Sequence, residues 1–154
     1  MPSTDPTFHA PLVRAARASA WLAKQVELAL QSVDLTPPQY RILTVLGSGS
    51  ASATDAAERL AVSPPSVTAI VDGLVARSLV GRVHGEDDRR RVQLSLTDEG
   101  RAALEGADEA VGRRLSELAS HSEDPDHVDH AIESLGWWLD AIRTMGDARR
   151  ASGR

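Results

Sequence analysis

The sequence lacks the signatures of several large classes of protein. Without cysteine it can form no disulfide bond, thiolate metal site or thiol redox switch. Aromatic residues make up 3% of the chain, and no apolar run approaches the roughly 18 residues that a membrane span needs. No secretory leader, phosphate loop or nucleophile elbow appears. We therefore expect a mostly helical, cytoplasmic protein that is not an enzyme and binds no cofactor.

Positive charge is concentrated in one part of the chain. The formal net charge is -5 at pH 7, which by itself argues against a nucleic-acid partner. Residues 52–97, however, hold six arginines against six acidic residues, so the negative excess lies outside this segment. Three of these arginines are consecutive, at positions 89–91. The distribution of charge thus leaves a nucleic-acid partner open.

The first half of the chain contains clear helix signals. Residues 1–10 hold two prolines and are expected to form a loose arm, after which apolar residues at helical spacing predict a helix over residues 11–32. In LTPPQYRILTVLG, a capping box formed by Thr36 and Gln39 is followed by a proline at the first helical position. Gly47 is a stop signal, so a short second helix is predicted.

Two more short helices are predicted to form a helix-turn-helix. Ser52 and Asp55 can cap a helix that ends near residue 60, and a turn of three residues, 61–63, follows it. Ser63 then caps a helix that has a proline in its first turn. The apolar residues of this last helix make one stripe: Val67, Ile70, Val71 and Leu74. Two short helices joined by so tight a turn are typical of a helix-turn-helix.

A hairpin is predicted over residues 79–96, with the charged stretch VHGEDDRRR at its tip. A helix-turn-helix followed directly by a hairpin is a winged helix. Its second helix can enter the major groove of DNA while the hairpin tip reaches the minor groove. Arginine suits a narrow minor groove, where negative potential is concentrated. The neighbouring acidic residues would repel phosphate groups, so their presence requires an explanation. We expect Asp88 to fix the conformation of one arginine through a bidentate ion pair.

The C-terminal part is predicted to contain two helices, the first capped by Thr97 and the second starting at residues 124–125. Apolar residues of the last helix step by 4, 3, 4 and 3: Val128, Ile132, Leu135, Leu139 and Ile142. Such a narrow seam packs along another helix. A bundle within one chain is one explanation. The two chain ends carry more apolar surface than the winged helix covers, which favours a homodimer.

The expected fold class is therefore mainly α with a small two-stranded β wing, in which a winged helix-turn-helix lobe adjoins a helical dimerisation region. We divide this one structural domain into three parts. Residues 1–35 form the N-terminal arm and a dimerisation helix, residues 36–97 the DNA-binding lobe, and residues 98–154 the C-terminal dimerisation helices.

Three stretches carry a resemblance to a known family: LTPPQYRIL, DAAERLAVSPPSVTAIVDGLVARSLVGR and DDRRRVQLSLTDEG. In this order they resemble the MarR-type (multiple antibiotic resistance regulator) family of bacterial transcription factors, over roughly residues 8–146. The hairpin motif of the family fits Asp88, Arg90, Leu96 and Thr97. The resemblance implies a dimer that binds double-stranded DNA at a palindromic operator as a repressor. Often a small ligand, such as a phenolic or other lipophilic anion, loosens this binding.

Carried over to this sequence, the resemblance assigns the minor-groove arginine of the wing to Arg90 and the residue that orders it to Asp88. Arg89 and Arg91 become flanking phosphate contacts. The recognition helix, which enters the major groove, is the predicted helix capped by Ser63. The face that reads the bases is expected to consist of four of its residues: Pro65, Ser66, Thr68 and Ala69.

The recognition helix departs from the family pattern. The family often has a basic residue where Ala69 and Gly73 stand, whereas this helix offers hydroxyl groups, methyl groups and Asp72. Two prolines, Pro64 and Pro65, also remove backbone N–H groups that could have bound phosphate. We therefore expect modest readout in the major groove and a larger share of the affinity from the wing.

Alternative interpretations concern a few other residues. His121, His127 and His130 lie among acidic residues, and a zinc-responsive regulator would use them as metal ligands. The same residues are also compatible with a solvated start of a helix. Trp21 is either a packing residue or part of an effector site. A winged helix used only for protein interaction remains a further alternative, supported by the acidic net charge.

Overall fold

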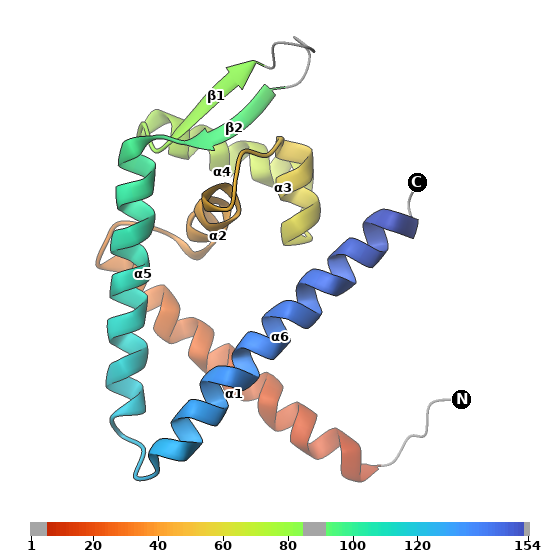
Figure 1. The fold of residues 1–154 in the computed structure, drawn as a ribbon, viewed down its shortest axis with the longest axis vertical. Helices are drawn as coiled ribbons and strands as arrows, with labels where there is room; N and C mark the ends of the chain where they lie inside the picture. The colour runs from red at the N-terminus through yellow and green to blue at the C-terminus, as the bar shows by residue number, and fades with distance from the viewer. Residues whose placement is uncertain (1–5, 85–91, 153–154) are drawn as a thin grey trace.

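The structure is a computed structural model that describes residues 6–84 and 92–152. Its elements follow the order expected for a winged helix: α1 (Pro6–Gln31), α2 (Pro37–Gly47), α3 (Ala53–Leu60), α4 (Pro64–Ala76), β1 (Val80–His84), β2 (Val92–Leu96), α5 (Asp98–Ala119) and α6 (Pro125–Ser152). Helices α2, α3 and α4 and the two strands form one lobe, from which α1 and α5 extend (Figure 1). Helix α6 begins at the far end of α5 and runs back toward the level of the lobe. The predicted fold class is confirmed.

The short helices begin where their capping residues predict. Gln39 N–H donates to the Thr36 hydroxyl, and the Gln39 side chain accepts from Thr36 N–H, so the predicted capping box starts α2. A second capping box joins Ser52 and Asp55 at the start of α3. Each box satisfies backbone N–H groups that have no partner within the helix.

The predicted loose arm is wrong for its last residues. Helix α1 begins at Pro6, five residues before the predicted start, and contains Pro11 in its interior. A proline lacks one backbone N–H and so weakens a helix at one position. Here the helix continues through that position, and the proline was a poor marker of its boundary.

The core of the lobe joins the end of α1 to α2, α4, α5 and the wing. The predicted stripe of α4 is confirmed, because Val67, Val71 and Leu74 are buried and Ile70 packs at the edge of the same core. The largest fully buried side chains of the core are those of α4 and four more residues: Leu30, Ile42, Leu43 and Leu94.

The wing is a two-stranded antiparallel sheet in which Val80 pairs with Leu96 and His84 with Val92. One residue from outside the hairpin joins it. Ala51 N–H donates to the Leu94 carbonyl oxygen at 3.1 Å, and Leu94 N–H donates back to Ala51 at 2.9 Å. The wing is thus attached by backbone hydrogen bonds to the segment that leads into α3.

Helix α5 starts in close contact with the two residues that precede β1, Ser78 and Leu79. Thr97 caps the helix by accepting from Gly100 N–H at 2.9 Å, and its own hydroxyl donates to the Ser78 carbonyl oxygen at 2.7 Å. A Cβ atom at Gly100 would lie 1.9 Å from the Leu79 carbonyl oxygen. This position therefore requires glycine because of the close approach of two backbones.

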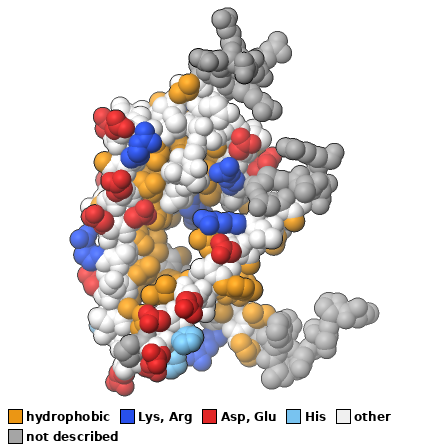
Figure 2. Space-filling model, viewed as in Figure 1, with side chains coloured by type: hydrophobic (Ala, Val, Ile, Leu, Met, Phe, Trp, Pro, Cys, Tyr) orange, Lys and Arg blue, Asp and Glu red, His pale blue; other side chains and the backbone are white. Residues whose placement is uncertain are grey.

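The chain ends differ from the lobe in their exposure. The apolar seam of α6 is open, with exposed fractions of 62% for Ile132, 46% for Leu135, 48% for Leu139 and 57% for Ile142. Hydrophobic side chains lie on the surface in the lower half of the molecule, where α1, α5 and α6 are found (Figure 2). Within the described residues, the seam is therefore not buried in a bundle of the same chain. None of the described helices combines the length and apolar character of a membrane span.

Candidate nucleic-acid interface

The turn between α3 and α4 brings the two helices into the helix-turn-helix arrangement. Ala61 adopts the left-handed conformation with φ of 53°, and its N–H bonds to carbonyl groups of the last turn of α3. Val62 N–H then donates to the Ala57 carbonyl oxygen at 3.0 Å. Ser63 accepts from Ser66 N–H at 3.4 Å and caps α4. The predicted helix-turn-helix is present.

The four predicted recognition residues share the outer surface of α4. Pro65, Ser66, Thr68 and Ala69 are all exposed, whereas the opposite face of the helix is buried in the core. The Thr68 hydroxyl donates to the Pro64 carbonyl oxygen at 3.1 Å. Because its proton is engaged, this hydroxyl oxygen can only accept further hydrogen bonds.

The predicted wing-tip residues lie outside the described part of the chain. These are Asp88, Arg89, Arg90 and Arg91. The structure does place the base of the wing, because β1 contacts α4 and β2 contacts α2 and α5. The strands therefore start from a fixed position beside the recognition helix.

Two ion pairs at α4 were not predicted from the sequence. Asp72, on the exposed side of α4, accepts a hydrogen bond from Arg82 Nη2 of β1. Arg77, at the end of α4, pairs with Asp34 at 3.2 Å and also donates to the Asp34 carbonyl oxygen at 2.8 Å. The first pair connects the recognition helix with the wing. The second connects that helix with the loop between α1 and α2.

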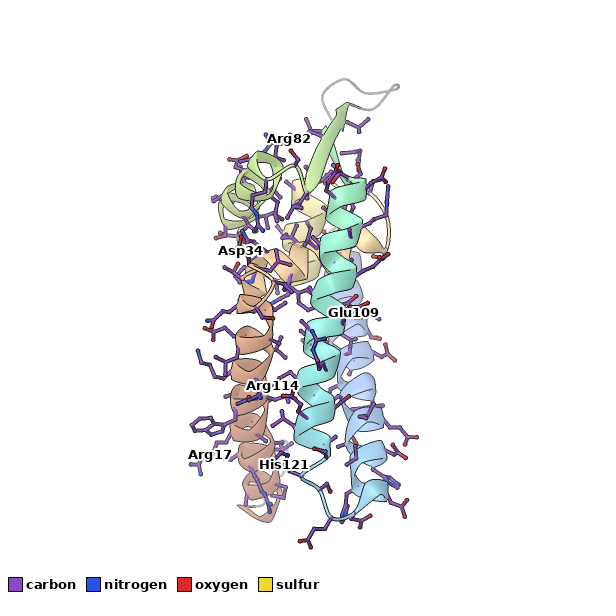
Figure 3. The ribbon with its side chains drawn as sticks, turned by 90° about the vertical axis from the view of Figure 1, so that its left-hand side faces the viewer. Arg17, Asp34, Arg82, Glu109, Arg114 and His121 are labelled. Carbon is purple, nitrogen blue, oxygen red and sulfur yellow. The ribbon has the colours of Figure 1, made fainter. Side chains whose placement is uncertain are left out.

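Two further contacts connect the long helices with their neighbours. The Tyr40 hydroxyl of α2 donates to Asp108 of α5 at 2.5 Å. Partial burial of the ring, the hydrogen bond and the charge of Asp108 together raise the pKa of Tyr40. Farther along α5, Arg114 donates to Gln25 of α1 from Nε at 3.0 Å and from Nη2 at 2.6 Å. Figure 3 shows Arg114 between these two helices.

The candidate effector and metal residues lie on the outside of the chain. Trp21, on α1, is 74% exposed. His127 pairs with Asp124 at 3.0 Å, while the Nδ1–H groups of His121 and His130 donate to backbone carbonyl oxygens of their own segments. In residues 6–84 and 92–152, no three histidine or acidic side chains converge as a set that could hold a metal ion.

The fold and the exposed recognition helix define a winged helix-turn-helix protein, and comparison with known proteins identifies its family. Residues 33–91 match the MarR family. The transcriptional repressor YetL of Bacillus subtilis is 34% identical over 116 residues, which cover 73% of this chain and 69% of YetL. The chain belongs to the MarR family.

Other similar proteins agree with this assignment. The transcriptional repressor MdtR of Bacillus subtilis is 37% identical over 95 residues, which cover 58% of this chain and 61% of MdtR. The match thus spans about three fifths of that relative. Among solved structures, the transcriptional repressor CouR bound to a 23-mer DNA duplex has a TM-score of 0.71 at 26% identity. That likeness covers 88% of this chain and 96% of CouR.

Proposed function

We propose that the protein is a sequence-specific DNA-binding regulator of transcription, in which α4 enters the major groove and the wing tip the minor groove. The observation that carries this proposal is the exposed face of α4 beside the base of the wing, in a member of the MarR family. The names of YetL and MdtR, both repressors, favour repression as the outcome of binding.

The exposed seam of α6 supports a homodimer as the binding species. Several half-exposed apolar side chains on one long helix are costly in water, and a second copy offers the matching surface. A dimer with twofold symmetry presents two recognition helices and therefore binds two half-sites of a palindrome. Light scattering at micromolar concentration tests this step, and a monomer would contradict it.

DNA binding itself is tested by selecting duplexes from a random library and measuring affinity for the selected sequence over a range of salt concentrations. We expect a palindromic consensus with half-sites about 10 base pairs apart and an affinity that falls steeply with salt. If the winged helix serves only to bind proteins, no consensus emerges and no steep salt dependence is seen.

The wing tip is expected to supply much of the affinity. Arg90→Ala removes one cation per protomer from the minor groove, so operator binding should weaken by about 1–3 kcal/mol per wing, with a flatter salt dependence. Arg101→Ala is the control, because Arg101 lies on α5 and pairs with Asp98 at 3.4 Å. Equal effects of the two substitutions would remove the argument for the wing.

A small lipophilic or phenolic anion is the proposed effector, at a site that includes Trp21. Because this side chain is largely exposed in the single chain, such a site needs a second surface, which the partner protomer supplies. The ligand must favour the dimer that does not bind DNA, so operator DNA must weaken ligand binding by the same factor. Salicylate titrations followed by tryptophan fluorescence, with and without saturating operator, test this coupling. Identical midpoints would contradict it.

A further inference from the structure

Asp72 is the acidic residue of the recognition helix, and its position is unfavourable for a helix that approaches DNA. It follows Pro65, Thr68 and Ala69 by seven, four and three residues, so it lies on the same helical face as these three. A carboxylate on this face repels the phosphate backbone. If this repulsion were the only effect of Asp72, a neutral residue at position 72 would give tighter DNA binding.

The partner of Asp72 offers a reason for its presence. Arg82 extends from β1 toward α4 and donates from Nη2 to the Asp72 carboxylate, while both side chains remain partly exposed. Figure 3 shows Arg82 where β1 passes α4. The ion pair thus holds a guanidinium group at the end of the predicted reading face, between the recognition helix and the wing.

A guanidinium group held in this way can still bind phosphate. The group carries five N–H donors in a rigid planar arrangement. The hydrogen bond to Asp72 comes from Nη2, so the N–H groups at Nε and Nη1 can donate to a phosphate group. A long side chain that is already ordered also loses less conformational entropy when it binds. The same pair connects β1 with α4 and so limits the movement of the wing relative to the recognition helix.

We propose that Asp72 and Arg82 act together in operator recognition. Arg82 contacts a phosphate group between the two grooves, and Asp72 is a positioning residue that holds Arg82 and the base of the wing in place. This inference rests on the proposed DNA binding and adds two residues that the sequence had not assigned to the interface.

The test compares three variants, Asp72→Asn, Asp72→Glu and Arg82→Ala, with the unchanged protein. Arg101→Ala is the control, because Arg101 lies on α5 and pairs with Asp98 rather than with Asp72 or Arg82. Each is titrated against the selected operator and against a scrambled duplex at several salt concentrations. Circular dichroism and the melting temperature verify that each variant is folded. Because both side chains are partly exposed, we expect all variants to fold.

Arg82→Ala should weaken operator binding by about tenfold. It should also make the slope of log affinity against log salt concentration shallower by about one per protomer. Asp72→Asn should weaken operator binding while leaving binding to the scrambled duplex unchanged or stronger, so that the ratio of the two affinities falls. Asp72→Glu, which keeps the carboxylate, should restore part of that ratio.

Stronger binding of Asp72→Asn to both duplexes would show that the carboxylate only repels DNA and would overturn the inference. An effect of Arg82→Ala no larger than that of Arg101→Ala would do the same. Failure of the proposed function is distinguishable, because the unchanged protein would then select no consensus sequence.

Discussion

The winged lobe and the helical ends of the chain use their apolar residues in opposite ways. In the lobe, Leu74 and Leu43 are completely buried, and helices, strands and the end of α1 share one core. In α6, an equally regular apolar pattern leaves four residues about half exposed to water: Ile132, Leu135, Leu139 and Ile142. The lobe is therefore stabilised within one chain, whereas the seam of α6 is not covered within the described chain and, in the proposed dimer, would be covered by the partner protomer. The following substitutions test that difference.

The largest effect is expected where the lobe meets α5. Gly100→Ala would place a Cβ atom against the Leu79 carbonyl oxygen. Because two backbones must separate, the free energy of unfolding should fall by about 4 kcal/mol. Gly106→Ala on the same helix is the matched control, since nothing lies within 4 Å of its Cβ position. Chemical denaturation should show that the control is unchanged or more stable by up to about 1 kcal/mol.

A pair of leucine substitutions separates the core from the seam. Leu74→Ala leaves a cavity in the lobe and should cost about 3 kcal/mol at every protein concentration. Leu139→Ala, on the exposed seam, should lower stability by an amount that depends on protein concentration, because it weakens association. Thermal unfolding at two concentrations distinguishes these cases. A concentration-independent loss for Leu139→Ala would contradict the assignment of the seam to a partner.

The contact between α2 and α5 should contribute less. Tyr40→Phe removes the hydrogen bond to Asp108 and should lower the free energy of unfolding by about 1 kcal/mol. Because the pKa of Tyr40 is raised in the folded state, the stabilising contribution is complete below the ordinary tyrosine pKa of about 10 and is lost as pH rises above it. The difference in the free energy of unfolding between the unchanged protein and Tyr40→Phe should therefore be constant around neutral pH and become smaller in alkali. Urea denaturation at several pH values measures it.

The smallest effect is expected for an exposed ion pair at the start of α5, which belongs neither to the core of the lobe nor to the seam of α6. Arg101→Ala breaks the contact with Asp98, in which both side chains are largely exposed. Its stability should stay within about 0.5 kcal/mol of the unchanged protein. A larger loss, measured by urea denaturation, would show that the start of α5 depends on more than Gly100 and its cap.

The sequence predicted the parts of this fold that depend on near neighbours along the chain. Capping boxes and apolar stripes join residues three or four positions apart, which is why the starts of α2, α3 and α4 were predicted correctly. The start of α1 was not, because a proline can be tolerated inside a long helix.

The unpredicted contacts of the site join distant residues. Tyr40 and Asp108 are 68 positions apart in the sequence. Arg77 lies 43 positions from Asp34, and Arg82 lies 10 positions from Asp72. No periodic pattern marks such pairs, since they arise only when separate elements pack together. The predicted recognition residues were assigned through a family resemblance, and their contacts with DNA stay a prediction.

The backbone bridge between Ala51 and Leu94 has a consequence for protein engineering. A designer who wishes to transplant the DNA preference of this lobe into another regulator must choose where to join the two sequences. A junction at residue 78 would separate the recognition helix from its hairpin and replace one side of the Ala51–Leu94 hydrogen bonds, at 3.1 and 2.9 Å. A functional chimera should therefore carry residues 34–100 as one uninterrupted cassette, which also keeps the Arg77–Asp34 pair and the close approach of Gly100 to Leu79.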